Sequence, residues 1–241
     1  MTEREWLNCT DPQAMLVLLK RRASKRKLRL FAVACCRRIW PLILHKRSQA
    51  AILVAERFAD AQATSAELRA AESEAKAIWQ KNALDDAAMA CFHVCTEQVA
   101  GLHASGTAVR AVWSHQLGEA RGRGDHVPDG LSFSQPIRAT EEAEQCRLFR
   151  DIFGNPFQPL PPRRSKRAWE DQKLRWITGN DRTVTKIAQA IYEDHAFARM
   201  PILADALEDG GCTDRAILDH CREPGEHVRG CWVVDLLLGK E

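Results

Sequence analysis

Helix-start signals recur along this chain, and they constrain its fold more than any other feature. Thr2 and Thr64 are each followed three residues later by a glutamate, the capping-box pattern that satisfies free amides of a first helical turn. Asp11 directly precedes Pro12, and an acidic cap before proline is typical of a helix start. No stretch shows the apolar–polar alternation of a half-buried strand. The pattern therefore predicts an all-α fold.

Composition favours the same class. Of the 241 residues, 45% are hydrophobic and 28% are charged, which is the balance of a soluble globular protein. Only one Tyr and eight Phe are present, and runs of β-branched residues are scarce, so helices are favoured over sheets. We expect a helical bundle with long Ala-rich helices, followed by a compact carboxy-terminal set of short helices.

Three regions are expected along the chain. A helical domain covers residues 1–120, a flexible linker rich in Gly and charge covers 121–139, and a second helical domain covers 140–241 and ends in a helix-turn-helix pair. In the first domain, the helix Leu28–Trp40 is apolar nearly all round, so it should be central and its Cys35 and Cys36 should be buried thiols.

The charge distribution is uneven. Eleven of the 35 Lys and Arg residues lie in 12–55, where there is no acidic residue. The rest of the chain contains the other 24 basic residues and all 32 acidic residues. A basic stripe of this kind is the electrostatic footprint of phosphate contacts, so segment 20–47 is a candidate for binding nucleic acid or another polyanion. The alternatives are a solvated helix face, or pairing of Arg37 and Arg38 with the acidic carboxy-terminal part. The candidate binding residues are Lys20, Arg21, Arg22, Lys25, Arg26 and Lys27.

The last thirty residues hold the densest set of chemically capable side chains. A helix is expected over Arg215–Arg222, and Pro and Gly in Glu223–Glu226 should break it. A second helix is expected over His227–Leu238. On that helix His227 and Cys231 would share a face, because they are four residues apart.

Thiolate and imidazole together are ligands typical of zinc. The predicted metal set is Cys221, His227 and Cys231, with a fourth ligand from elsewhere in the chain. His220 points about 100° away from Cys221 on a helix, so these two neighbours are not expected to bind one ion. The first alternative is that the cysteines simply pack in the core as small hydrophobes. The second is a Cys–His nucleophile site, with Asp235 continuing the line along the helix.

Five blocks at the two ends of the chain surround an Ala-rich middle. They are Met1–Leu7, Leu28–Trp40, Leu148–Phe157, Met200–Asp214 and His220–Lys240. In amino-acid sequence these blocks resemble an uncharacterised family of bacterial hypothetical proteins. The resemblance implies relatedness without an activity, because no function is established for that family.

The function favoured by these observations is an interaction or scaffold module with a protein partner, rather than an enzyme. Zinc is the one cofactor that the residues suggest. The start of the chain is polar and acidic, unlike a secretory signal, and no apolar run approaches the length of a membrane span. A cytoplasmic protein with nine reduced thiols is therefore expected.

Overall fold

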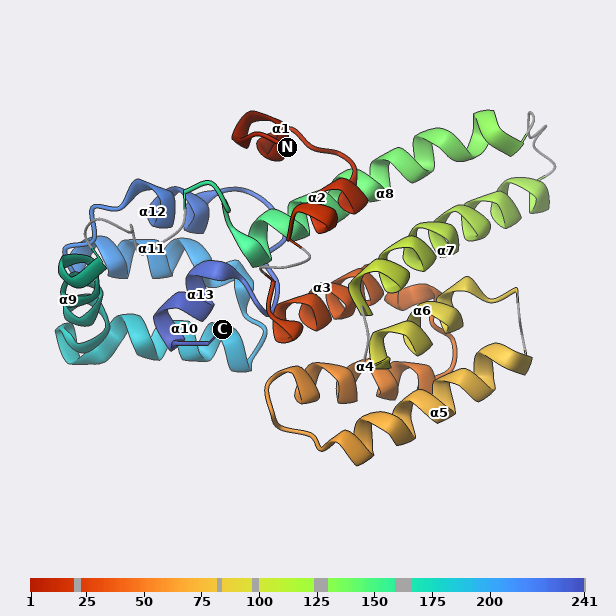
Figure 1. Cartoon of the computed structure of the whole chain (residues 1–241), viewed down its shortest axis with the longest axis horizontal. Helices are drawn as coiled ribbons and strands as arrows, with labels where there is room; N and C mark the ends of the chain where they lie inside the picture. Colours follow the sequence, from red (N-terminus) through yellow and green to blue (C-terminus); the bar gives the residue numbers. More distant parts are fainter. Residues whose placement is uncertain (20–22, 82–83, 97–99, 124–129, 159–165, 241) are drawn as a thin grey trace. The chain divides into compact units, whose positions relative to one another are not determined.

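The computed structural model describes residues 1–241 except 20–22, 82–83, 97–99, 124–129, 159–165 and 241 (Figure 1). The described residues form thirteen α-helices, three short 3-10 helices and no strand, which confirms the predicted all-α class. A search of the same residues finds no helix with the length and apolarity needed to cross a membrane.

The chain folds as two compact units. The first contains residues 8–149 together with Met1, and the second contains residues 2–7 and 150–241, so the first unit interrupts the second in sequence. The division differs from the expected linker over 121–139. Residues 121–122 end helix α7 (Ala100–Gly122), residues 130–139 begin helix α8 (Gly130–Phe153), and 124–129 lie outside the described residues.

Helix α8 continues through a proline, which explains this difference. Pro136 lies inside the helix, where proline removes one backbone donor and normally kinks or ends a helix. The hydroxyl of Thr140 donates to the carbonyl oxygen of Pro136 one turn earlier, at 2.9 Å, which is the bonding of a residue inside a helix. The composition of 130–139 therefore indicated a flexible linker, whereas these residues are part of helix α8.

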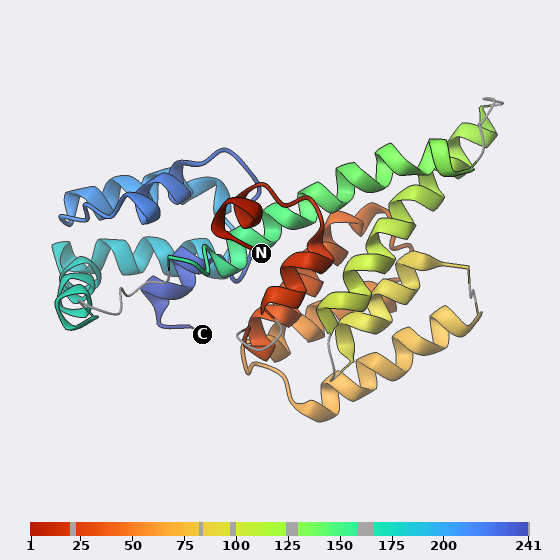
Figure 2. The same ribbon diagram turned by 45° about the horizontal axis from the view of Figure 1, so that its top comes forward.

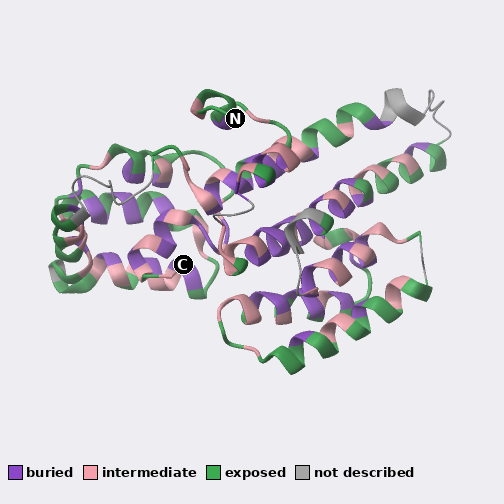
Figure 3. Cartoon of the chain, in the orientation of Figure 1, coloured by how far each residue is buried: buried purple, intermediate pink, exposed green. Residues whose placement is uncertain are grey.

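The first unit is built around one buried helix, α3. Every residue from Leu30 to Cys36 is at most 3% exposed, as the run of apolar residues predicted, and both thiols are buried (Figure 3). Helix α3 packs against α4, α6 and α7, while α4 and α5 lie side by side (Figures 1 and 2). The helices of this unit, besides α7 and most of α8, are α2 (Pro12–Leu19), α3 (Lys25–Arg38), α4 (Lys46–Ala59), α5 (Ser65–Lys81) and α6 (Asp86–Cys95), with a 3-10 helix at Trp40–Leu42.

The second unit has its own core of short helices. One face of helix α10 buries Val184, Ala188 and Ile191, and this helix packs against α9, α11 and α13. The end of α8, which carries Asp151, belongs to this unit. Its other helices are α1 (Glu3–Leu7), α9 (Lys166–Thr178), α10 (Thr183–Glu193), α11 (Met200–Asp209), α12 (Arg215–Arg222) and α13 (Trp232–Leu238), with 3-10 helices at Asn180–Arg182 and Phe197–Arg199.

The helix starts of α1, α5 and α12, predicted from local pattern, are confirmed. In the capping box of α1, the Thr2 amide donates to Glu5 at 2.7 Å and the Glu5 amide donates to the Thr2 hydroxyl at 3.3 Å. The same reciprocal pair opens α5, between Thr64 and Glu67. Asp214 caps α12 by accepting from the amide of Ala216 at 3.0 Å.

The last helix begins later than its apolar pattern indicated. Helix α13 starts at Trp232, so the expected helix over His227–Leu238 is wrong in its first five residues. Gly230 has φ of 98°, a left-handed conformation that an α-helix cannot contain. The amide of Cys231 donates to the carbonyl oxygen of Val228 at 2.9 Å, which closes a turn just before the helix. Residues 223–231 therefore form a loop, named here the α12–α13 loop.

Candidate metal centre

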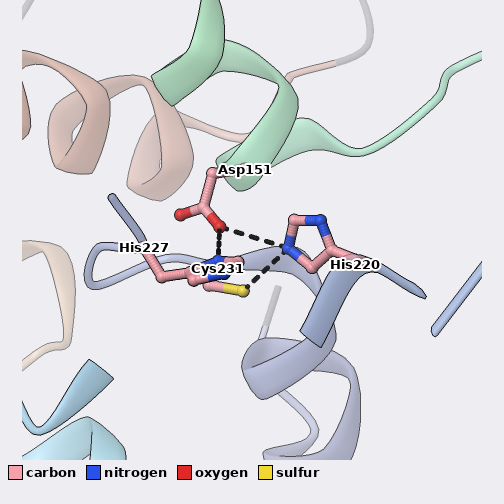
Figure 4. A group of neighbouring side chains, drawn as sticks. All are labelled: Asp151, His220, His227 and Cys231. Carbon is pink, nitrogen blue, oxygen red and sulfur yellow. Dashed lines mark hydrogen bonds and ion pairs between the residues drawn. The ribbon is translucent and has the colours of Figure 1, made fainter. Parts of the chain in front are cut away.

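Four side chains of the second unit converge on one point (Figure 4). Asp151 lies in the last turn of α8, His220 lies near the end of α12, and His227 and Cys231 lie in the α12–α13 loop. Each offers one ligand atom, and these atoms all lie within 4.8 Å of one another. They are the one group of this kind among the residues that the structure describes.

The α12–α13 loop is held in place by contacts on both sides. The guanidinium of Arg229 lies 4.5 Å from the ring centroid of Tyr192 and also donates to the Tyr192 carbonyl oxygen, at 3.4 Å. On the other side the backbone amide of Val228 donates to Asp151 Oδ2 at 2.9 Å. The loop is therefore held through the side chain of Arg229 and the backbone of Val228, two residues that lie between His227 and Cys231.

Asp151 is the centre of the group. Its Oδ1 atom lies 2.6 Å from His227 Nδ1 and 3.1 Å from His220 Nε2. The residue is only 4% exposed. Burial would raise the pKa of this carboxyl, but the hydrogen bonds and charges of the two histidines outweigh burial and lower its pKa. Asp151 is thus a buried carboxylate.

His227 is the partner that Asp151 holds most closely. Burial disfavours the imidazolium, yet the hydrogen bond and negative charge of Asp151 prevail and raise the pKa of His227. A hydrogen bond with the backbone of Glu223 and the charge of that residue also raise the pKa of His227. Only 8% of this side chain is exposed.

Cys231 completes the group. Its Sγ atom lies 3.3 Å from His220 Nε2, and the residue is fully buried. Burial raises the pKa of the Cys231 thiol well above its usual value, and the negative charge of Asp151 acts in the same direction. The backbone amides of Val234 and Val233 favour the thiolate and so oppose this rise. Without a nearby cation, Cys231 is a neutral thiol at physiological pH.

The structure brings together two of the three residues predicted as metal ligands. His227 and Cys231 belong to the group, whereas Cys221 is outside it. Cys221 is 1% exposed and packs with Ile217 on the buried face of α12, where burial raises its pKa to about 12. Because neighbours on a helix point about 100° apart, α12 turns His220 towards the group when Cys221 faces the core.

Sequence reasoning missed Asp151 and chose the wrong neighbour on α12. Asp151 precedes His227 by 76 residues, and nothing in its local sequence marks it as a ligand. A signal did exist for His220: Ile217, Leu218 and Cys221 recur at the spacing of a buried helix face, which leaves His220 off that face. The alternative, in which His227, Cys231 and Asp235 share one face of a helix, is not formed, because His227 and Cys231 both precede helix α13.

The residues predicted to bind nucleic acid lie in or near α3. Lys20, Arg21 and Arg22 fall outside the described residues, while Lys25, Arg26 and Lys27 form the first turn of α3. Lys25 is exposed, whereas Arg26 pairs with Asp60 at 2.9 Å.

Two further cations of the basic segment are also paired within the first unit. Arg37 pairs with Glu56 at 2.7 Å, and Arg38 pairs with Glu141 at 2.9 Å. Carboxylates from α4 and α8 thus neutralise part of the basic stretch. Binding of a polyanion by segment 20–47 stays a prediction.

The burial of the thiols leads to a prediction about their reactivity. Eight of the nine cysteines are buried, and only Cys9 is partly exposed. Burial raises the pKa of Cys95 to about 12 and that of Cys212 to about 11, which leaves almost no reactive thiolate there. We expect the native protein to release one equivalent of thionitrobenzoate rapidly from Ellman's reagent, and all nine after denaturation. Cys9→Ser should abolish the fast phase, and a second fast thiol would contradict the expectation.

Comparison of the chain with protein-family models, with curated proteins and with solved structures finds no match. The predicted resemblance to a bacterial family therefore stays a prediction, and the chemistry of the site is argued from its own geometry.

Proposed function

We propose that the second unit binds one zinc-type ion through Asp151, His220, His227 and Cys231. The observation that carries the proposal is the convergence of four donor groups from three segments on one buried point. Thiolate and imidazole donors favour Zn²⁺ and Co²⁺ over Mg²⁺ and Ca²⁺, which prefer oxygen ligands. Four protein donors match the closed coordination of a structural zinc site.

Some of the separations between the donor atoms are close to those of a tetrahedral site, and all of them are within 4.8 Å. Metal–ligand distances of about 2.0–2.3 Å place neighbouring ligand atoms roughly 3.3–3.8 Å apart in a tetrahedron. Two of the observed separations, 3.1 Å from His220 Nε2 to Asp151 Oδ1 and 3.3 Å from His220 Nε2 to Cys231 Sγ, are near this range. The separation between Asp151 Oδ1 and His227 Nδ1 is 2.6 Å, so these two atoms would have to move apart by about 1 Å when an ion binds.

Charge balance also supports a divalent cation. One carboxylate, one thiolate and two neutral imidazoles around Zn²⁺ have no net charge, so the complex suits a buried position. The cation would also reverse the effect of burial on Cys231, because it stabilises the thiolate, and the proton of the coordinating thiol is released to solvent. A nucleophilic role for Cys231 has less support, since burial raises the pKa of its thiol and a nucleophilic cysteine needs the thiolate form.

The role of such an ion is structural. It would add a further link between the end of α8, helix α12 and the α12–α13 loop, which hydrogen bonds of Asp151 and His220 already connect. A stiffened carboxy-terminal unit is suitable for an interaction or scaffold protein, the function class favoured by the sequence, and that wider role remains a proposal.

Metal analysis tests the proposal. Protein purified without chelators, or reconstituted with Zn²⁺, is expected to hold one ion per chain, as measured by inductively coupled plasma mass spectrometry. Cys231→Ser and His220→Ala should lose it. Cys221→Ala is the matched control: it removes a thiol of the same core that lies outside the group, so the ion should remain. Wild-type protein that takes up no Zn²⁺ or Co²⁺ after reconstitution would refute the metal site.

A further inference from the structure

A glycine and a tryptophan beside the four donors make contacts that the donors themselves do not explain. Gly154 follows the end of α8 and has φ of 63°, while Trp232 is the first residue of α13. A Cβ atom at residue 154 would lie 3.2 Å from Cγ and 3.3 Å from Cδ2 of the Trp232 indole. The indole ring therefore lies against the Gly154 backbone. A side chain at residue 154 would strain the left-handed backbone and would require the indole to shift by a few tenths of an ångström.

The same indole also reaches a donor. Its ring centroid lies 5.2 Å from that of His220, with the planes tilted by 46°. His227 approaches His220 as well, edge to face, with ring centroids 4.9 Å apart. The imidazole of His220 is thus bounded by Trp232 and by His227, which limits its rotation about the side-chain bonds.

The position of this contact in the chain adds to its effect. Gly154 is three residues after Asp151, and Trp232 directly follows Cys231. The contact between glycine and indole therefore fixes the separation of the two segments that carry the anionic donors. The indole atoms nearest to residue 154 are all carbon, so the contact needs no ion to form.

From this geometry we infer that Trp232, seated on Gly154, is a positioning residue of the metal site. It holds His220 Nε2 towards Asp151 and Cys231 before an ion arrives. The inference rests on the proposed metal site. Trp232 donates no ligand atom, so its loss should weaken metal binding and alter the coordination geometry without changing the number of ions bound. Residues that orient metal ligands contribute roughly 10- to 100-fold to metal affinity.

Cobalt substitution tests this role in the full chain. We expect Trp232→Leu to bind Co²⁺ about 10- to 100-fold more weakly in competition with a chelator, and to change the visible d–d bands of tetrahedral Co²⁺. Trp232→Phe keeps an aromatic face against His220 and should recover most of the affinity. Trp176→Leu is the control for general loss of core packing, because Trp176 is equally an indole of this unit but lies on α9, which carries no donor. Circular dichroism establishes that each variant is folded.

A second pair of variants tests the contact between Gly154 and the indole of Trp232. Gly154 and Gly211 both have positive φ, so alanine strains the backbone at either position, but a Cβ at 211 meets nothing within 4 Å. Gly154→Ala should weaken Co²⁺ binding and shift its bands, and Gly211→Ala should leave both unchanged.

The outcomes separate the two proposals. If the wild-type protein gives tetrahedral Co²⁺ bands while Trp232→Leu matches it in affinity and spectrum, the positioning role fails and the metal site stands. Equal losses in Trp176→Leu and Trp232→Leu would also overturn the positioning role, because the effect would then be one of general packing. If the wild-type protein binds no Co²⁺, the metal site and the positioning role fail together.

Discussion

Removal of the ion by a chelator is expected to destabilise the second unit and to leave the first nearly unchanged. A ligand that binds only the folded state stabilises it by about 4 kcal/mol when its free concentration is roughly a thousand times Kd. All four donors lie in residues 150–241, so the linkage acts on that unit. Hydrogen exchange followed by mass spectrometry measures both units in one sample, with and without chelator.

The control for this experiment is Cys231→Ser, whose exchange should not respond to the chelator because the site is already incomplete. Faster exchange in α12 and in the α12–α13 loop is the specific signature, since the ion would join these segments to the end of α8. Equal acceleration in both units, or none in residues 150–241, would contradict a structural role for the ion.

Replacement of Asp151 by leucine is expected to lower the free energy of unfolding of the metal-free second unit by about 3–5 kcal/mol, the cost of breaking a buried ion pair by removing one partner. The substitution leaves His227, His220 and the amide of Val228 without the carboxylate that they share. Urea denaturation of chelator-treated protein measures the change. Asp205→Leu is the matched control: its side chain is 71% exposed and pairs with Arg222 on the surface, where a pair contributes at most about 1 kcal/mol.

The effect of Asp151→Leu should depend on pH in a defined direction. The pKa of Asp151 is lowered from 3.8, so its contribution is present above that value and is lost as pH falls through the lower folded pKa. The pKa of His227 is raised from 6.5, so its contribution is full below 6.5 and is lost as pH rises through the higher folded pKa. The difference between wild type and variant should therefore be largest between about pH 4 and 6.5. A difference that grows steadily above pH 8 would contradict this assignment.

The helices of this protein could be predicted because their signals are local. The hydrogen bonds between Thr2 and Glu5, and between Thr64 and Glu67, join residues three positions apart, so a short stretch of sequence contains both partners. The burial of residues 30–36 of α3 was predictable for a similar reason, since a helical stretch that is apolar on nearly every side has no face to present to water.

The candidate site was predictable only in part. His227 and Cys231 were found because they are near in sequence, although the helix assumed between them is a loop closed by Gly230. The choice between His220 and Cys221 depended on how α12 is rotated about its axis. That rotation follows from Ile217 and Leu218, which face the core, and this pattern can be seen in the sequence once it is examined.

The sequence by itself determined the helical class, the capped starts of α1, α5 and α12 and the buried central helix, because each depends on residues within one or two turns of one another. Only the tertiary structure decided that Asp151 meets His220, His227 and Cys231, that Trp232 rests on Gly154, and that the chain divides between residues 149 and 150. These features depend on how helices far apart in the chain pack together. Such packing is fixed by the summed burial of many side chains, and no single local pattern contains it.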